Sequence, residues 1–148
     1  MDARTAGGYA VAMPTQRQAL VADIAALWEL RTRAVRVSCA SHYAPEVIEA
    51  WCAAAPPDRL PRLPETGELD AAFVDPAEQG RGIAGRLLAA LDAMARERGL
   101  HRLFLSASLN ALPFYERAGY VAVRRETYPH RSGIGLESVF MEKTLPCA

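Results

Sequence analysis

The chain has 148 residues, of which 17 are basic and 17 acidic, so its formal net charge is zero. This length suits a single domain spanning residues 1–148, which buries about two thirds of its unfolded surface in one core. The balanced charge excludes the broad positive field on which nucleic-acid binding depends, so we expect no nucleic-acid partner.

The cysteines and the apolar stretches indicate the compartment. Cys39, Cys52 and Cys147 are an odd number without metal-ligand spacing, which predicts reduced thiols and no metal site. The first residues lack a basic region followed by an apolar core, and the most apolar stretch, ALVADIAALW, is interrupted by Asp23. We therefore expect a soluble, cytoplasmic protein that does not bind a membrane.

The first third of the chain predicts one short strand and two helices. Residues 9–13, YAVAM, alternate weakly and end at Pro14, which indicates a strand, and Thr15 is a candidate helix cap. A second helix has Pro45 near its first turn. Apolar residues at helical spacing predict a first helix that ends near Ser38: Leu20, Ile24, Leu27 and Leu30. The inner face of the second helix is formed by Val47, Ile48 and Trp51.

The middle of the chain predicts a connector and then a strand. Residues 54–67 contain four prolines and almost no strand pattern, so they read as an extended connector. Residues 68–74, ELDAAFV, alternate polar and apolar side chains before Asp75 and Pro76 interrupt them. This strand delivers the chain into the glycine-rich stretch DPAEQGRGIAG, residues 75–85.

The last third predicts two helices and three strands. A helix that ends at Gly99 follows the glycines, and we expect Asp92 to lie away from its buried stripe, which consists of Ile83, Leu87, Leu88, Leu91 and Met94. Residues 102–108 form a strand, and a short helix follows with Asn110 as a candidate cap and Gly119 as its end. Residues 120–125 and 136–145 then form two closing strands joined by the turn at 129–135.

The glycine-rich stretch fits two kinds of phosphate-binding turn. As Gly80-x-Gly82-x-x-Gly85 it has the spacing of a dinucleotide-binding turn, in which backbone amides approach a pyrophosphate at a helix start. Such a fold places an acidic residue about twenty positions further on, at the end of the next strand. That strand ends in Leu-Ser-Ala-Ser, residues 105–108, without a carboxylate, which argues against a dinucleotide.

Read as Gln79-x-x-Gly82-x-Ala84, the same stretch resembles the acyl-CoA loop of the GCN5-related N-acetyltransferases (GNAT family). LDAAFVDPAEQGRGIAGRLLAAL, ASLNALPFYERAGY and SVFMEKTL follow one another in that family's order, and HYAPEVIEAW resembles its second helix in one bacterial branch. The resemblance implies an α/β fold with a mixed, mostly antiparallel twisted sheet flanked by helices. Two strands that relatives carry are missing or reduced between residues 55 and 67, so we expect a smaller sheet.

The resemblance also implies where acetyl-CoA binds as co-substrate. The pantetheine arm pairs with the backbone around Phe73 and Val74. A side chain on Gly82 would crowd the pyrophosphate. Asn110 is a weaker cofactor candidate, because the asparagine of many relatives stands where this chain has Ser108. Backbone amides along the loop bind the pyrophosphate: Gln79, Gly80, Arg81, Gly82, Ile83, Ala84 and Gly85.

Two residues match the positions that carry the family's proton transfers, and a third is an alternative to one of them. Tyr115 matches the tyrosine that protonates the departing thiolate, although an aromatic ring packed beside Phe114 in the core would give the same pattern. Glu68 matches the catalytic base of the histone-acetylating branch, and Asp70 could serve instead or bind a cationic acceptor. Both carboxylates are equally typical of a solvated strand face.

The acceptor pocket of the family is bordered by segments that here contain His42, Tyr43, Tyr128 and His130. We expect an acyl-CoA-dependent N-acyltransferase that passes acetyl from acetyl-CoA to a primary amine of a small molecule or peptide. Two alternatives stay open. One is a degenerate CoA-binding or sensory module. The other is an interaction domain whose exposed sheet edge binds a partner, including a second copy in a homodimer.

Overall fold

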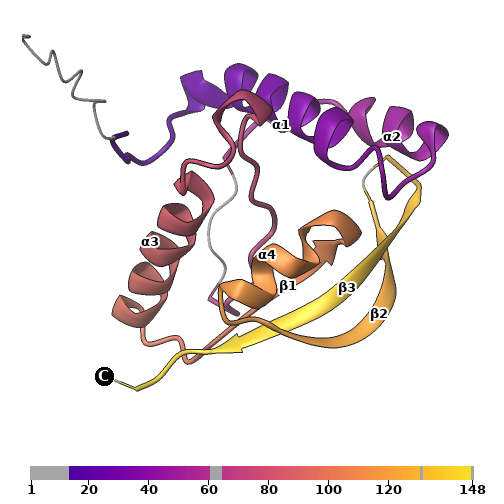
Figure 1. The fold of residues 1–148 in the computed structure, drawn as a ribbon. Coiled ribbons are helices and arrows are strands. Elements are labelled where there is room, and N and C mark those ends of the chain that lie inside the picture. Colours follow the sequence, from indigo (N-terminus) through magenta and orange to yellow (C-terminus); the bar gives the residue numbers. More distant parts are fainter. Residues whose placement is uncertain (1–13, 61–64, 131, 148) are drawn as a thin grey trace, which may run out of the picture.

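The computed structural model describes residues 14–60, 65–130 and 132–147. Within them the chain forms four α-helices and three strands, joined by short 3-10 turns (Figure 1). The helices are α1 (Ile24–Ser38), α2 (Pro45–Cys52), α3 (Ile83–Glu97) and α4 (Leu112–Arg117). The strands are β1 (Arg102–Ser108), β2 (Val121–Pro129) and β3 (Gly135–Thr144), and the 3-10 turns are η1 (Val21–Asp23), η2 (Pro76–Glu78) and η3 (Leu109–Ala111).

The three strands form an antiparallel sheet in the order β1-β3-β2. β3 is central, so that Phe140 pairs with Ser106 on one side and with Arg124 on the other. The β2–β3 pairing contains an irregularity between Ala122 and Arg124. The sheet and the four helices confirm the predicted α/β class and the closing hairpin.

Two hydrophobic clusters hold the helices to the sheet. In β1, side chains alternate between buried and half-buried, and Leu103, Leu105 and Ala107 face α3 and α4 in the first cluster. The second cluster joins α1, α2 and the far end of the β2–β3 hairpin, where Trp51 and Leu136 are buried together. Figure 1 shows the same division, with α1 and α2 over the hairpin end and α3 at the opposite side.

Helix α3 buries a different stripe from the one that its sequence predicts. Leu88 and Ala95 are buried, but Leu87 is 43% exposed and Met94 is 42% exposed. Asp92 is buried instead, so its predicted place outside the stripe is wrong. The reason is a partner distant in sequence, since Lys143 of β3 places its Nζ 2.5 Å from Asp92 Oδ2.

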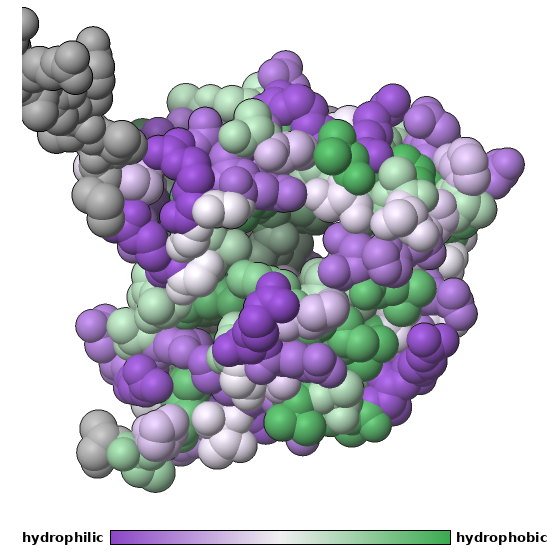
Figure 2. Space-filling model, in the orientation of Figure 1, coloured by the Kyte–Doolittle hydropathy of each residue, from purple (hydrophilic) through white to green (hydrophobic). Residues whose placement is uncertain are grey.

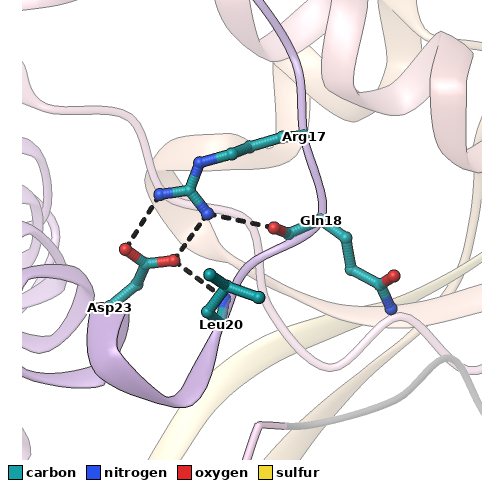
Figure 3. Close-up of polar contacts among 4 residues, drawn as sticks. All are labelled: Arg17, Gln18, Leu20 and Asp23. Carbon is teal, nitrogen blue, oxygen red and sulfur yellow. Dashed lines mark hydrogen bonds and ion pairs between the residues drawn. The ribbon is translucent and has the colours of Figure 1, made fainter.

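An ion pair anchors the segment before α1 (Figure 3). Both guanidinium nitrogens of Arg17 donate to the Asp23 carboxylate, at 2.7 and 2.9 Å, and the N–H of Leu20 donates to Asp23 Oδ2 at 2.8 Å. These hydrogen bonds lower the pKa of Asp23 to about 2. Leu20 and Asp23 occupy the cap positions of η1 and α1, so the prediction that Thr15 caps this helix is wrong. The predicted strand at 9–13 lies outside the described residues.

The predicted strand at residues 68–74 is reduced to a single bridge. Glu68 pairs in parallel with Phe104 of β1, supported by hydrogen bonds from the N–H of Leu69 to Phe104 O at 2.9 Å and from the N–H of Phe104 to Gly67 O at 3.1 Å. Residues 70–75 then belong to no strand of the described chain. The prediction of a full strand is wrong, because no second strand pairs with this segment among the described residues.

Three further predictions concern the connector, the Asn110 cap and the membrane. No helix or strand interrupts the described residues 53–60 and 65–67, in keeping with the shortened sheet that the sequence indicated. Asn110 lies inside η3 and the cap position of α4 is Ala111, so the prediction of an Asn110 cap is wrong. In the described part of the chain, no helix has the length and apolar character needed to cross a membrane.

Candidate active site

The glycine-rich loop forms an open cradle at the start of α3. Gly80 and Gly82 have φ of 78° and 74°, the left-handed region that glycine adopts readily, and Gly82 is the N-cap of α3. The N–H of Arg86 bonds to Gly82 O at 3.1 Å, so the N–H groups of Ile83, Ala84 and Gly85 precede the first helical bond. They lie at the positive end of the helix dipole, where an anion binds.

Open space surrounds the same glycines. A Cβ placed on Gly80, Gly82 or Gly85 would meet no atom of the described chain within 4 Å. Positive φ, and not close packing, accounts for glycine at positions 80 and 82, and the open space leaves room for an anion bound by the backbone. The loop fits the predicted CoA pyrophosphate.

Side chains of α1 hold the loop from outside. Gln79 Nε2 donates to Ser38 Oγ at 2.9 Å, and Arg33 Nη2 donates to Asp75 Oδ2 at 2.7 Å. The bond from Arg33 is the largest cause that lowers the pKa of Asp75. The side chain of Arg81, a predicted cofactor residue, forms an ion pair with Glu78. Neither Ser38 nor Arg33 was predicted from the sequence. The residues around a polar side chain on an exposed helix face do not indicate which distant loop it contacts.

The chain separates from β1 immediately before this loop. After the bridge at Glu68, residues 70–75 run away from β1 toward α1 (Figure 1). Phe73 packs against the second hydrophobic cluster and Val74 is half-buried. Backbone groups in an extended segment without a neighbouring strand can bond an extended ligand as an added strand would. Figure 2 shows the surface hollowed at the middle of the molecule, with hydrophobic residues lining the hollow.

Tyr115 lies in the core beneath the sheet. It is 7% exposed, and its ring packs edge-on against Phe114 and Tyr120, with centroids 5.2 and 5.6 Å away. Burial raises the pKa of Tyr115 to about 12, so the phenol keeps its proton at every physiological pH. The two interpretations of this tyrosine are therefore compatible: it packs in the core, and it holds a proton.

The two predicted carboxylates lie near Tyr128 of β2. Glu68 and Asp70 are exposed, while Tyr128 is half-buried against the second cluster. Burial is the main cause that raises the pKa of Tyr128, and the negative charges of Asp70 and then Glu68 add to it. The charges of both predicted carboxylates therefore act on Tyr128.

Tyr43 joins three elements. Its hydroxyl donates to Glu137 O at 2.6 Å and accepts the N–H of Leu109 at 3.0 Å. Its ring lies edge-on to Trp51, with centroids 5.5 Å apart. Burial is the main cause that raises its pKa. Both contacts of the hydroxyl are with backbone, so in this structure Tyr43 ties the turn after α1 to η3 and β3.

The two histidines differ in their surroundings. His130 lies 6.1 Å from the ring of Trp51, with Arg31 Nη2 3.3 Å from its Nε2 and Ser132 Oγ 2.8 Å from its Nδ1. Arg31 is only 6% exposed and also donates to Trp51 O at 3.0 Å. His42 is exposed and contacts Ser41 Oγ at 2.8 Å. The structure therefore gathers Tyr43, Tyr128 and His130 around the second cluster and leaves His42 at the surface.

Asn110 lies beside α1. Its side chain lies close to the Cys39 thiol, whose pKa burial raises to about 11. Its Oδ1 is buried and has no hydrogen-bond partner among the described residues. This places Asn110 at the end of α1. No group of three or more potential metal ligands occurs among the described residues.

The family that shares this loop and sheet matches most of the described chain. The sequence pattern of the acetyltransferase (GNAT) domain matches residues 60–145. The chain belongs to this family. The match begins before the Glu68 bridge and ends after β3, so it includes the loop, α3, α4 and the whole sheet. It confirms the family predicted from the sequence.

Relatives of this GNAT domain are known by sequence. It is 29% identical to the uncharacterized N-acetyltransferase YafP of Escherichia coli K12 over 125 residues, 70% of this chain and 79% of YafP. It is 33% identical to glucosamine 6-phosphate N-acetyltransferase of Trypanosoma brucei brucei over 60 residues, which span 40% of this chain and only 41% of that enzyme. These relatives support a GNAT-type N-acetyltransferase, as predicted.

Solved structures share the fold. A GCN5-related N-acetyltransferase from Rhodopseudomonas palustris superposes with a TM-score of 0.80 at 28% identity, covering 90% of this chain and 97% of the other. The PaiA N-acetyltransferase from Thermoplasma acidophilum, solved in complex with coenzyme A, superposes with a TM-score of 0.62 at 17% identity, covering 86% and 96% of the two chains. At that identity the second likeness concerns the fold alone.

Proposed function

We propose that this GNAT domain transfers an acetyl group from acetyl-CoA to a primary amine of a small molecule or peptide. One observation carries the proposal: the left-handed turn at Gly80 and Gly82 opens α3 directly after an extended segment that has left β1. An anion cradle and an extended backbone that pairs with no described strand lie close together in the chain. A long ligand with a pyrophosphate in the middle and amides along one arm needs both.

The loop and the segment before it would hold acetyl-CoA. The amides of residues 79–85 bind the pyrophosphate, and the backbone at Phe73 and Val74 bonds the pantetheine arm. Bound there, acetyl-CoA supplies a thioester carbonyl for attack by the amine. The protein contributes orientation, because ligand and acceptor are held together in one cleft.

The attacking amine must be uncharged, so a base has to take its proton. Glu68 and Asp70 are the candidates, since both are exposed and both act on the pKa of Tyr128. A carboxylate acts in this role directly or through one water molecule. The same negative charges favour the approach of a cationic amine before it loses its proton.

The departing sulfur needs a proton, which we assign to Tyr115. Burial raises the pKa of the Tyr115 phenol to about 12, so the phenol stays protonated. The pKa of an ordinary thiol is lower, at about 8.5. Proton transfer from this phenol to a hydrated thiolate is therefore unfavourable. It becomes easier where the thiolate is itself desolvated, because desolvation raises the basicity of a thiolate as well.

The test of this proposal is calorimetric titration of the protein with acetyl-CoA, with NAD as the control, followed by an assay of CoA thiol release with and without amines. We expect binding of acetyl-CoA alone and release that depends on the amine. Binding without amine-dependent release would instead support a CoA-binding or sensory module. No binding by the folded protein would overturn the proposal, and association that rises with concentration would then favour an interaction domain.

A further inference from the structure

The loop that would bind the pyrophosphate is attached to α1 by two side-chain contacts that lie outside the anion cradle. We propose that Ser38 and Arg33 of α1 are positioning residues, which hold the loop of residues 75–85 in its anion-binding conformation. Ser38 acts through Gln79, and Arg33 acts through Asp75. The inference rests on the function proposed above and adds to it two residues of a different element.

The first contact sets the direction of Gln79. Its amide donates from Nε2 to Ser38 Oγ at 2.9 Å, so the side chain points to α1. The next residue, Gly80, has φ of 78°, and a Cβ there would meet nothing within 4 Å. A loop of such glycines has many accessible conformations. The hydroxyl of Ser38 therefore fixes the last residue with a side chain before the turn.

The second contact fixes the start of the loop. Asp75 is the cap of η2 and accepts the N–H of Ala77 through Oδ1 at 3.1 Å. Its other oxygen, Oδ2, accepts from Arg33 Nη2 at 2.7 Å. The guanidinium thus orients the carboxylate that shapes the first turn of the loop. Ser38 and Arg33 together hold residues on both sides of η2 against one rigid helix.

Loss of either contact would let the loop leave the binding conformation for part of the time. The apparent dissociation constant of a ligand rises as the competent fraction falls. Both contacts are exposed, and such contacts stabilise weakly, so we expect about a threefold to tenfold effect from each. The effect falls on the dissociation constant and KM for acetyl-CoA, while kcat stays the same.

A double-mutant cycle on Ser38→Ala and Gln79→Ala tests the first contact, with CoA as the titrated ligand. Gln79→Ala keeps the backbone amide and loses only the side chain. We expect each single variant to weaken CoA binding about threefold to tenfold, the double variant to be no weaker than either, and Ser38→Thr to bind normally. Weaker binding in Gln79→Ala alone would mean that Gln79 contacts the ligand itself and would overturn the role of Ser38.

The second contact has a matched control on the same helix. Arg33→Met removes a guanidinium that is 52% exposed and bound to the loop, and Arg36→Met removes one that is also 52% exposed but bound to Glu49 of α2. We expect a higher KM for acetyl-CoA in the first variant and wild-type kinetics in the second. Equal effects of the two variants, or a fall in kcat alone, would overturn the role of Arg33.

The wild-type titration separates this inference from the proposed function. If folded wild type binds no CoA, the proposed function fails and the inference fails with it. If wild type binds CoA and the Ser38 and Arg33 variants bind it equally well, the inference alone is wrong. Thermal unfolding of each variant shows that the loop, and not the whole fold, has changed.

Discussion

Two segments of similar pattern, residues 68–74 and β1, have different fates in this protein. Both alternate polar and apolar side chains over part of their length, and both were predicted as strands. β1 pairs with β3 from Arg102 opposite Thr144 to Ser108 opposite Ser138, while the earlier segment makes one bridge, at Glu68. Alternation thus indicates an extended backbone, but pairing needs a neighbouring strand. The segment left without one supplies a side of the proposed cofactor cleft.

The largest expected effect tests whether β1 contributes more to the stability of the fold than residues 68–74 do. Leu103→Ala removes a side chain with no exposed surface and should lower the free energy of unfolding by about 2–5 kcal/mol in urea denaturation. Leu69 of the segment 68–74 is only half-buried, so Leu69→Ala should lower the free energy of unfolding by less. An equal loss in both variants would remove the distinction between the two segments.

The next largest effect concerns Tyr115 of α4. Tyr115→Phe keeps the ring contacts and should lower kcat about 100-fold or more while leaving the unfolding midpoint near that of wild type. Tyr120→Phe is the control, because Tyr120 is equally buried and its hydroxyl has no hydrogen-bond partner among the described residues. That variant should be fully active and at least as stable. Full activity in Tyr115→Phe would leave this tyrosine a packing role only.

A smaller effect tests the loop at the end of the unpaired segment. Gly82→Val should raise the dissociation constant of CoA about tenfold to 100-fold, because valine is strained at this backbone angle and its side chain enters the anion cradle. Gly99→Val has the same φ of 74° and the same empty surroundings, but it lies at the other end of α3. It should show the same loss of stability with unchanged CoA binding. Equal CoA binding by both variants would contradict the cradle.

The smallest effect tests whether the charge of Asp70, in the segment before the loop, acts on Tyr128 of β2. Asp70→Asn removes a negative charge that raises the pKa of Tyr128, so this pKa should fall toward its ordinary value, as followed by NMR titration of the tyrosine ring. Glu137→Gln is the control, since the charge of Glu137 acts on Tyr43. It should lower the pKa of Tyr43 and leave that of Tyr128 unchanged. No change of Tyr128 in Asp70→Asn would place the carboxylate elsewhere.

Two of the predictions that failed, those for Asp92 and Asn110, share one cause. Asp92 was expected at the surface and is buried, because Lys143 neutralises it from another element. Asn110 was expected to cap a helix and instead contacts Cys39. In each case the local sequence describes the residue's preference correctly, but a residue distant in the chain offers a more favourable partner. Such partners leave no signal at the position itself.

The sequence by itself determined the elements that depend on local chemistry. β1 spans the predicted residues 102–108, α1 ends at Ser38 as expected, and Gly80 and Gly82 adopt the left-handed turn that only glycine makes readily. Hydrophobic period and backbone conformation depend on near neighbours, so they can be read from a short stretch. The tertiary structure alone decided that residues 70–75 pair with no strand of the described chain, that Arg31 is buried, and that Ser38 and Arg33 contact the loop. These depend on distances between elements far apart in the chain, which no local pattern encodes.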